Sequence, residues 1–179
     1  MNIISIDPGY SRKGQGCACA YVGNDETGLK TWFARPQDKY VLSELPFYAH
    51  VDRIIIEQPQ QDSRSWSIPP AVLMQLSWDG AWLAGLYAGR NACSVVPLTP
   101  SASKGSVSKP IAHKRLWAKL TGEERDALGG NPTFAQICKA CERGALDKWS
   151  RAGAEYYPSK WLQHNILDAV ALGVGYLGR

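Results

Sequence analysis

The sequence predicts an α/β fold, a mixed five-stranded sheet flanked by helices, in a single domain over residues 1–179. Three observations lead to this prediction. Short apolar segments near the N-terminus are joined by turns and loops, as in an antiparallel meander. Two isoleucine-rich runs each end in an acid followed by a proline. A long apolar helical segment then separates the second run from another strand, as in a parallel strand–helix–strand unit.

Length and composition agree with this architecture. A chain of 179 residues suits one domain with a full-sized core and would barely suffice for two. The hydrophobic content of 45% and the charged content of 20% are those of ordinary globular proteins. Five scattered cysteines argue against a secreted disulfide framework. With no signal-peptide pattern and no apolar stretch long enough to cross a membrane, we expect a cytoplasmic protein without a membrane partner.

The first strand is expected over residues 3–7, because a short β-branched run favours a buried strand. Pro8 and Gly9 end it and turn the chain away. Asp7 therefore stands where the strand leaves the core, and a carboxylate there needs a metal, a cation or backbone N–H groups. The next expected elements are strands over 17–22 and 29–34 and a short helix around 39–45.

Residues 51–59 repeat the opening pattern. Three isoleucines run without a polar break, as in a strand buried on both faces, and Glu57 and Pro59 follow. Alone, either acid would most simply be a capping or surface residue. Two strands that end in the same way favour a shared site, with Asp7 and Glu57 at one edge of the sheet.

The later elements follow from apolar periodicity and capping residues. They are a helix over 71–89, a strand over 93–98, a helix from 109 or 110 to 120, a helical turn at 121–124, a helix from 131–132, and a last helix over about 160–177. The wide apolar face of the first of these helices suits packing on the sheet, and a subunit contact could use the remainder. Cys138 and Cys141 are expected on one helical turn; zinc is the less favoured alternative, because no second ligand pair stands at ordinary spacing.

The last helix carries a third acid. Asp168 lies within an apolar run, where a merely solvated role is less natural, and Asn165 and His164 precede it by three and four residues on the same helix face. Three acids from two strand ends and one helix suit Mg²⁺ or Mn²⁺. Two such ions can activate a water and stabilise the leaving oxygen in phosphoryl chemistry.

A basic segment precedes that helix. Between residues 103 and 119 there are five cations and no acid. A solvated helix face is the plain interpretation of such a run, and contact with nucleic-acid phosphates is the other.

These motifs resemble those of the RuvC-type Holliday-junction resolvases of the ribonuclease-H-like superfamily. The matching segments, in matching order, are Ile-Ser-Ile-Asp7-Pro-Gly9, Ile-Ile-Ile-Glu57-Gln and Asn165-Ile-Leu-Asp168-Ala169. The resemblance implies a ribonuclease-H-like fold, a homodimer, and metal ligation by the three acids with two ions in each site. It also implies that four-way DNA junctions are resolved by paired symmetric nicks that leave 5′-phosphate and 3′-hydroxyl ends.

Phage-type members of that family carry Trp-Lys-Gly followed by a lysine. Here Ser103-Lys104-Gly105 and Lys109 are similar, with serine in place of the tryptophan. The resemblance implies that Lys104 and Lys109 lie near the scissile phosphate and take part in catalysis. Lys114 and Arg115 would then bind backbone phosphates. A phage-encoded protein would work in the cytoplasm of its bacterial host.

Two positions depart from the family pattern or stay open. The family's fourth ligand is an acid or histidine three residues before the last acid, where this chain has Asn165, with His164 one place earlier. Either could complete the metal site. Family members also place an aromatic wedge in the loop after the strand-borne Glu, and Trp66, near Arg64, is the candidate DNA contact there, although a loop tryptophan can equally serve packing.

Other functions remain as alternatives. The same fold could act on RNA–DNA hybrids, replication forks or flaps. Asn165 in an acid position would suit a catalytically inactive DNA-binding module. A sugar-kinase-like phosphotransferase also places an acid and a glycine turn after its first strand, but 179 residues leave no room for the duplicated domain of that family. No organic cofactor is expected.

Overall fold

Five strands form one mixed sheet in the computed structural model, which describes residues 1–8, 17–34, 46–59, 69–100, 102, 107, 109–129 and 158–179. The strands lie in the order β3-β2-β1-β4-β5. Their bounds are β1 Ile3–Asp7, β2 Cys17–Val22, β3 Leu29–Ala34, β4 Arg53–Glu57 and β5 Ser94–Leu98. β1, β2 and β3 are antiparallel neighbours, whereas β4 is parallel to β1 and to β5. The predicted meander followed by parallel strands is confirmed.

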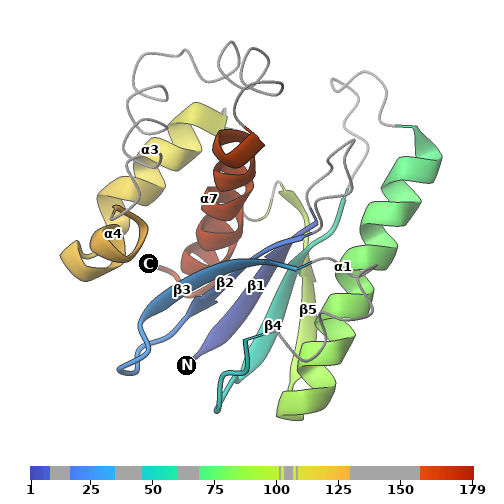
Figure 1. Cartoon of the computed structure of the whole chain (residues 1–179), viewed down its shortest axis with the longest axis horizontal. Coiled ribbons are helices and arrows are strands. Elements are labelled where there is room, and N and C mark those ends of the chain that lie inside the picture. The colour runs from blue at the N-terminus through green and yellow to red at the C-terminus, as the bar shows by residue number, and fades with distance from the viewer. Residues whose placement is uncertain are drawn as a thin grey trace.

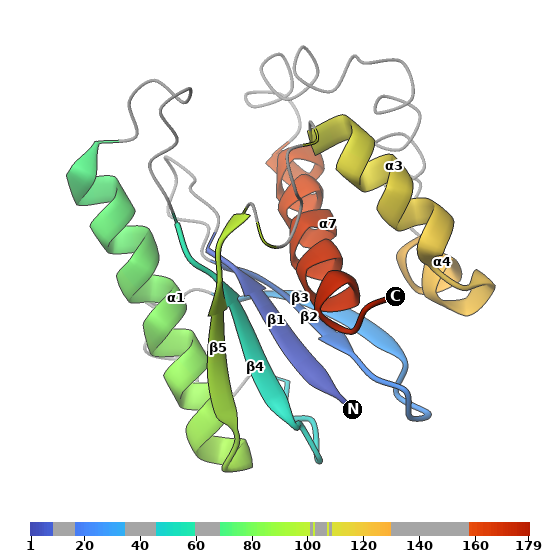
Figure 2. The same cartoon turned by 180° about the vertical axis from the view of Figure 1, so that it is seen from behind.

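Helices cover both faces of this sheet (Figures 1 and 2). Helix α1 (Pro70–Asn91) lies on one face, and α7 (Pro158–Tyr176) lies on the other, with α3 (Lys109–Lys119) and α4 (Gly122–Gly129) beside α7. The helices expected around 39–45 and from 131–132 lie outside the described residues. Within the described ranges, no helix is both long and apolar enough to cross a membrane.

The alternation of side chains along the central strands divides the core in two. Ile3 and Ile55 belong to the cluster under α7, whereas Ile4, Ile6 and Ile54 belong to the cluster under α1. Because successive strand residues point to opposite faces, odd-numbered residues of β1 and β4 face α7. Both clusters are fully apolar at these positions, which explains why the two isoleucine runs form the centre of the sheet.

Helix α1 comes very close to the chain that leaves β1. A Cβ atom at Gly80 would lie 2.7 Å from Cγ of Pro8 and 2.8 Å from Cδ1 of Ile56. Real Cβ atoms do not approach other atoms so closely, so only glycine permits this contact. Pro8, the residue directly after Asp7, therefore packs against the backbone of α1 at Gly80.

Helix α7 approaches β1 and β2 in the same way. The Ser5 hydroxyl, fully buried in β1, donates a hydrogen bond of 2.7 Å to the carbonyl oxygen of Ala169. A Cβ atom at Gly173 would lie 2.8 Å from Cγ2 of Val22 and 2.9 Å from Oγ of Ser5. The absence of a side chain at Gly173 therefore permits the close approach of α7 to β1 and β2.

We expect Gly173→Ala to lower the free energy of unfolding by about 1–2 kcal/mol, because overpacking a core contact outweighs the helix propensity gained with alanine. Urea denaturation followed by circular dichroism would measure this. Gly89→Ala is the matched control: a Cβ atom there meets nothing within 4 Å. The control should be neutral or slightly stabilising, and an equal effect of both variants would contradict the packing explanation.

The helical turn predicted at 121–124 forms the start of α4, and Thr121 and Glu124 cap it reciprocally. The amide of Thr121 donates to Oε2 of Glu124 at 2.8 Å, and the amide of Glu124 donates to the Thr121 hydroxyl at 3.1 Å. Arg179 adds a bidentate pair to the same carboxylate, with both contacts at 2.7 Å. Burial acts to raise the pKa of Glu124, but the hydrogen bonds from Arg179 and Thr121 hold that pKa below its usual value.

Candidate functional site

Asp7 and Glu57 lie side by side at the end of the parallel strand pair. Ile6 of β1 pairs with Ile56 of β4, and continuing this register sets Asp7 opposite Glu57. Both are odd-numbered, so both face α7. Adjacent strands are about 4.8 Å apart, which is within the span that one cation can bridge with two carboxylates. Asp7 is 8% exposed and Glu57 is half-buried.

Helix α7 runs antiparallel to these strands. Its Tyr176 hydroxyl accepts a hydrogen bond from Nη1 of Arg53 at the start of β4, while Ala169 contacts Ser5 farther along β1. From Ser5 to Asp7 the strand rises about 6.6 Å. From Ala169 back to Asn165 the helix rises about 6 Å. Asn165, a buried amide, therefore lies at the level of Asp7.

Asp168 is held from the side by a residue of another helix. Nε2 of His113, in α3, lies 2.9 Å from Oδ1 of Asp168. The side chains of His113 and Asp168 are 0% and 2% exposed, so this contact is sealed from solvent. An ionised carboxylate only accepts hydrogen bonds. When Asp168 is charged, Nε2 of His113 therefore carries a hydrogen and donates a hydrogen bond to Oδ1.

His113 lies within the basic segment of residues 103–119, and the sequence analysis did not identify this contact. A signal was present: His113, Leu116 and Leu120 follow the spacing of a buried helix stripe, and all three are buried. A histidine on such a stripe needs a polar partner in the core.

The electrostatic environment around Asp7 is negative on the α1 side as well. Burial raises the pKa of the Cys17 thiol, and the charges of Asp79 and Asp7 raise that pKa further. Two carboxylates thus act on one buried thiol next to the strand end. A cation placed at this edge would be favoured by the same field.

The donor atoms of the candidate site suit a divalent ion, but the described side chains are not arranged as a complete ligand set. Asp7, Glu57 and Asp168 supply the hard oxygens that Mg²⁺ and Mn²⁺ prefer. Among the described side chains, however, no group of three or more His, Cys, Asp or Glu lies close enough together to hold a metal ion. The side chains of Asp7, Glu57 and Asp168 are all described, so these three acids do not by themselves form a metal site in this structure. The remaining candidate ligands are the amide of Asn165 and His164, whose side chain lies outside the described residues.

The predicted DNA-binding residues are described only in part. Lys114 and Arg115 are exposed on α3. Lys109 begins that helix, but its side chain lies outside the described residues. Arg64, Trp66 and Lys104 lie outside the described residues altogether, and so do Cys138 and Cys141.

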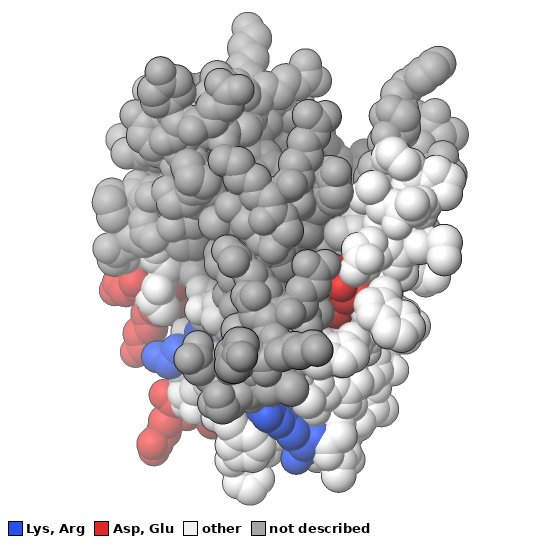
Figure 3. All heavy atoms as spheres, turned by 45° about the vertical axis from the view of Figure 1, so that its right-hand side comes forward, with Lys and Arg blue, Asp and Glu red and all other residues white. Residues whose placement is uncertain are grey.

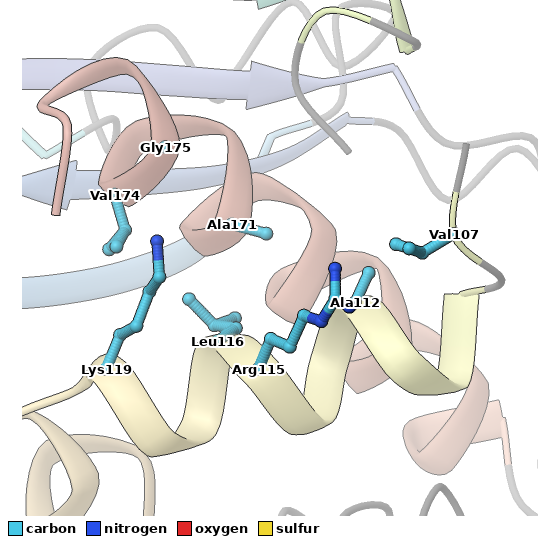
Figure 4. Close-up of a pocket in the computed structure, with 8 residues that line it drawn as sticks. All are labelled: Val107, Ala112, Arg115, Leu116, Lys119, Ala171, Val174 and Gly175. Atoms are coloured by element: carbon cyan, nitrogen blue, oxygen red, sulfur yellow. The ribbon is translucent and has the colours of Figure 1, made fainter. Parts of the chain in front are cut away.

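A cavity of about 180 Å³ lies between α3 and α7, and Leu116, Ala171 and Val174 line it. Figure 4 shows Arg115 and Lys119 over this cavity.

The helices share one orientation relative to the acid-bearing edge. Helices α1, α3 and α7 all begin at the side of the sheet where β1 and β4 end (Figure 2). Helix N-termini present unpaired N–H groups and favour nearby negative charge, including phosphate.

No protein-family model matches the chain, and no curated protein matches it.

Proposed function

We propose that this chain is a metal-dependent, structure-selective endonuclease that resolves four-way DNA junctions, as its resemblance to RuvC-type resolvases implies. One observation carries the proposal: Asp7 and Glu57 end adjacent parallel strands in register, on the face that α7 covers. Asn165 at the same level and Asp168 one turn along that helix extend the set of oxygen donors.

In this proposal Asp7, Glu57 and Asp168 hold Mg²⁺ or Mn²⁺, two ions in each site, with Asn165 or His164 as the fourth ligand. The ions would supply charge stabilisation and water activation for phosphodiester hydrolysis. Lys104 and Lys109 lie near the scissile phosphate and balance its charge. Exposed cations of α3 bind the DNA backbone without sequence preference. These residues are Lys114 and Arg115.

Loop residues would contribute shape recognition. Trp66 would wedge into the open centre of the junction, with Arg64 on a nearby phosphate. The products carry 5′-phosphate and 3′-hydroxyl ends. The proposed compartment is the cytoplasm, that of a bacterial host if the protein is phage-encoded.

We also propose a homodimer that uses α1. Met74, Trp78 and Trp82 recur every fourth residue, and their side chains are 73%, 70% and 36% exposed. The 22 residues of α1 include only two charged ones, Asp79 and Arg90. The α1 side of the molecule is accordingly almost free of charge in Figure 3. A second copy is the proposed occupant, because two symmetric nicks need two sites and an uncharged helix can pack on its own copy.

A substrate panel tests the activity. Synthetic four-way junctions, forks, flaps, RNA–DNA hybrids and linear duplex are incubated with Mg²⁺, Mn²⁺ or EDTA. Paired symmetric nicks in the junction, lost in EDTA, support the proposal. Preferential cutting of hybrids, forks or flaps would instead select the ribonuclease-H-like alternative. Junction binding without cutting in either metal would select the inactive DNA-binding module.

Asn165→Asp tests the fourth ligand. An added carboxylate at the level of Asp7 strengthens the attraction for a divalent ion, so we expect Mn²⁺ affinity to rise about tenfold. Isothermal titration calorimetry on the protein alone would measure it. His164→Ala is the companion variant: if it weakens binding while Asn165→Asp has no effect, His164 is the ligand.

A further inference from the structure

The cavity between α3 and α7 combines an apolar lining with a positively charged rim. Leu116 and Val174, which line it, are only 4% and 1% exposed. Arg115 and Lys119 are exposed, and both side chains leave α3 on the side that faces α7 (Figure 4). None of the described residues that line the cavity is acidic. The complementary ligand is therefore an apolar body that carries an anionic group.

The size of the cavity follows from small residues on both helices. Ala112 of α3 and Ala171 and Gly175 of α7 line it. Because these residues have at most a Cβ atom, the two packed helices leave a space between them instead of filling it with side chains. The cavity volume is about 180 Å³. An apolar cavity of about 150 Å³ is enough to hold benzene, so this one suits a body of a single ring.

The two cations at the rim favour a doubly charged anion. Arg115 and Lys119 are four residues apart on one helix, so they are neighbours of like charge that repel each other. No carboxylate of the described residues forms an ion pair with either. Lys119 donates one hydrogen bond to the carbonyl oxygen of Arg179, which leaves two of its three N–H groups for a ligand.

A phosphate monoester matches this pair of charges better than a carboxylate does. It carries a charge of about −1.5 to −2 at neutral pH, and its oxygens accept the parallel hydrogen bonds that a guanidinium group donates. A phosphate placed between Arg115 and Lys119 would also offset their mutual repulsion.

We propose that this cavity binds a small organic phosphate, with its single ring among the apolar side chains and its phosphate on Arg115 and Lys119. The site goes beyond the proposed nuclease, which uses Arg115 only for phosphates of the DNA backbone. Two sources supply the same chemistry: a free phosphate monoester in solution, and a nucleotide within a DNA strand that lies along α3.

Phenyl phosphate is the probe, added to the isotope-labelled full chain in EDTA and without DNA, with binding followed by NMR. We expect a dissociation constant of about 0.1–1 mM. Inorganic phosphate has the charge without the ring, and phenol has the ring without the charge. Each should bind at least about tenfold more weakly than phenyl phosphate. Naphthyl phosphate, with two rings, should also bind more weakly, because it exceeds the cavity.

Variants separate the apolar and the charged contributions. Ala171→Leu fills the cavity and keeps both cations, whereas the double variant Arg115→Gln with Lys119→Gln keeps the cavity and removes the charges. Each should weaken phenyl phosphate binding by about tenfold or more. The matched controls are Ala118→Leu, exposed on α3 and outside the cavity lining, and Lys30→Gln, an exposed cation on β3. Both should stay within about twofold of the wild type.

Thermal melting checks that each variant folds. If Ala171→Leu does not fold, Ala112→Leu fills the cavity from α3 and takes its place. Equal affinities for inorganic phosphate and phenyl phosphate would overturn the proposal, and so would unchanged phenyl phosphate binding in the folded cavity-filling variant. The absence of saturable binding to the wild type at concentrations on the order of 10 mM would overturn it as well. None of these results bears on the nuclease, which is tested with metal and DNA.

Competition identifies the source of the phosphate. Displacement of bound phenyl phosphate by dTMP but not by a single-stranded thymidine oligonucleotide supports the site with a free ligand. Displacement by both supports the site with a nucleotide of a DNA strand.

Discussion

Asp7→Asn is expected to reduce junction cutting by about 10³-fold or more while the junction is still bound. A divalent ion contributes several kcal/mol to transition-state stabilisation, and every 1.4 kcal/mol is a factor of ten in rate. Asparagine keeps the size of the side chain but removes the charge that the ion needs. Single-turnover cleavage in saturating Mg²⁺, with junction affinity measured by gel shift in Ca²⁺, would separate the two effects.

Asp126→Asn is the matched control, because Asp126 is an exposed aspartate on α4. It should cut like the wild type. Asp7→Asn should also melt no lower than the wild type, since it removes one of several like charges at the strand ends. A folded Asp7→Asn protein that cuts at the wild-type rate would remove Asp7 from the chemistry and, with it, the geometric basis of the proposed nuclease.

Trp78→Glu is expected to convert the dimer into a monomer. A central interface tryptophan commonly contributes about 2–4 kcal/mol, and a charge in its place adds desolvation. The dimer dissociation constant should rise roughly 30- to 1000-fold, as measured by sedimentation equilibrium. The fold should persist, because this side chain is 70% exposed in the isolated chain. Nicking should continue, but the two cuts should lose their coordination.

Ile111→Glu provides the comparison. It places the same charge at an apolar helix position that is 48% exposed, on α3 and away from α1. Its dimer constant should stay at the wild-type value. A wild-type chain that sediments as a monomer at all concentrations, or equal effects of both variants, would show that α1 is not the subunit contact.

The sheet could be predicted because each central strand is specified by residues within the strand and directly after it. Uninterrupted isoleucine runs specify central strands, and the acid and proline after each run mark where the strand stops. The register that sets Asp7 beside Glu57 follows from two similar strands being parallel neighbours. Helix α1 was expected over 71–89 and spans 70–91. It could be predicted closely because prolines mark its start and a long apolar pattern marks its length.

The side-chain partner of Asp168 could not be predicted in the same way. His113 and Asp168 are 55 residues apart, and their meeting depends on how α3 packs on α7. Helical periodicity shows that His113 is on a buried stripe but not which residue lies opposite. The role of Ser5 was missed for a similar reason: a serine in a strand gives no indication that a helix carbonyl 164 residues later will accept its hydroxyl.

Glycine at position 80 has a consequence for the proposed dimer. Since the α1 backbone touches Pro8 without an intervening side chain at position 80, about one helix diameter separates the outer face of α1 from the end of β1, where Asp7 lies. In a dimer built on that face, the distance between the two active sites would be set by backbone contacts, and changes of side-chain rotamer would hardly alter it. A larger residue at position 80 would move α1 away from Pro8 and so increase that distance. The spacing between the paired nicks is therefore the property that depends most directly on this contact.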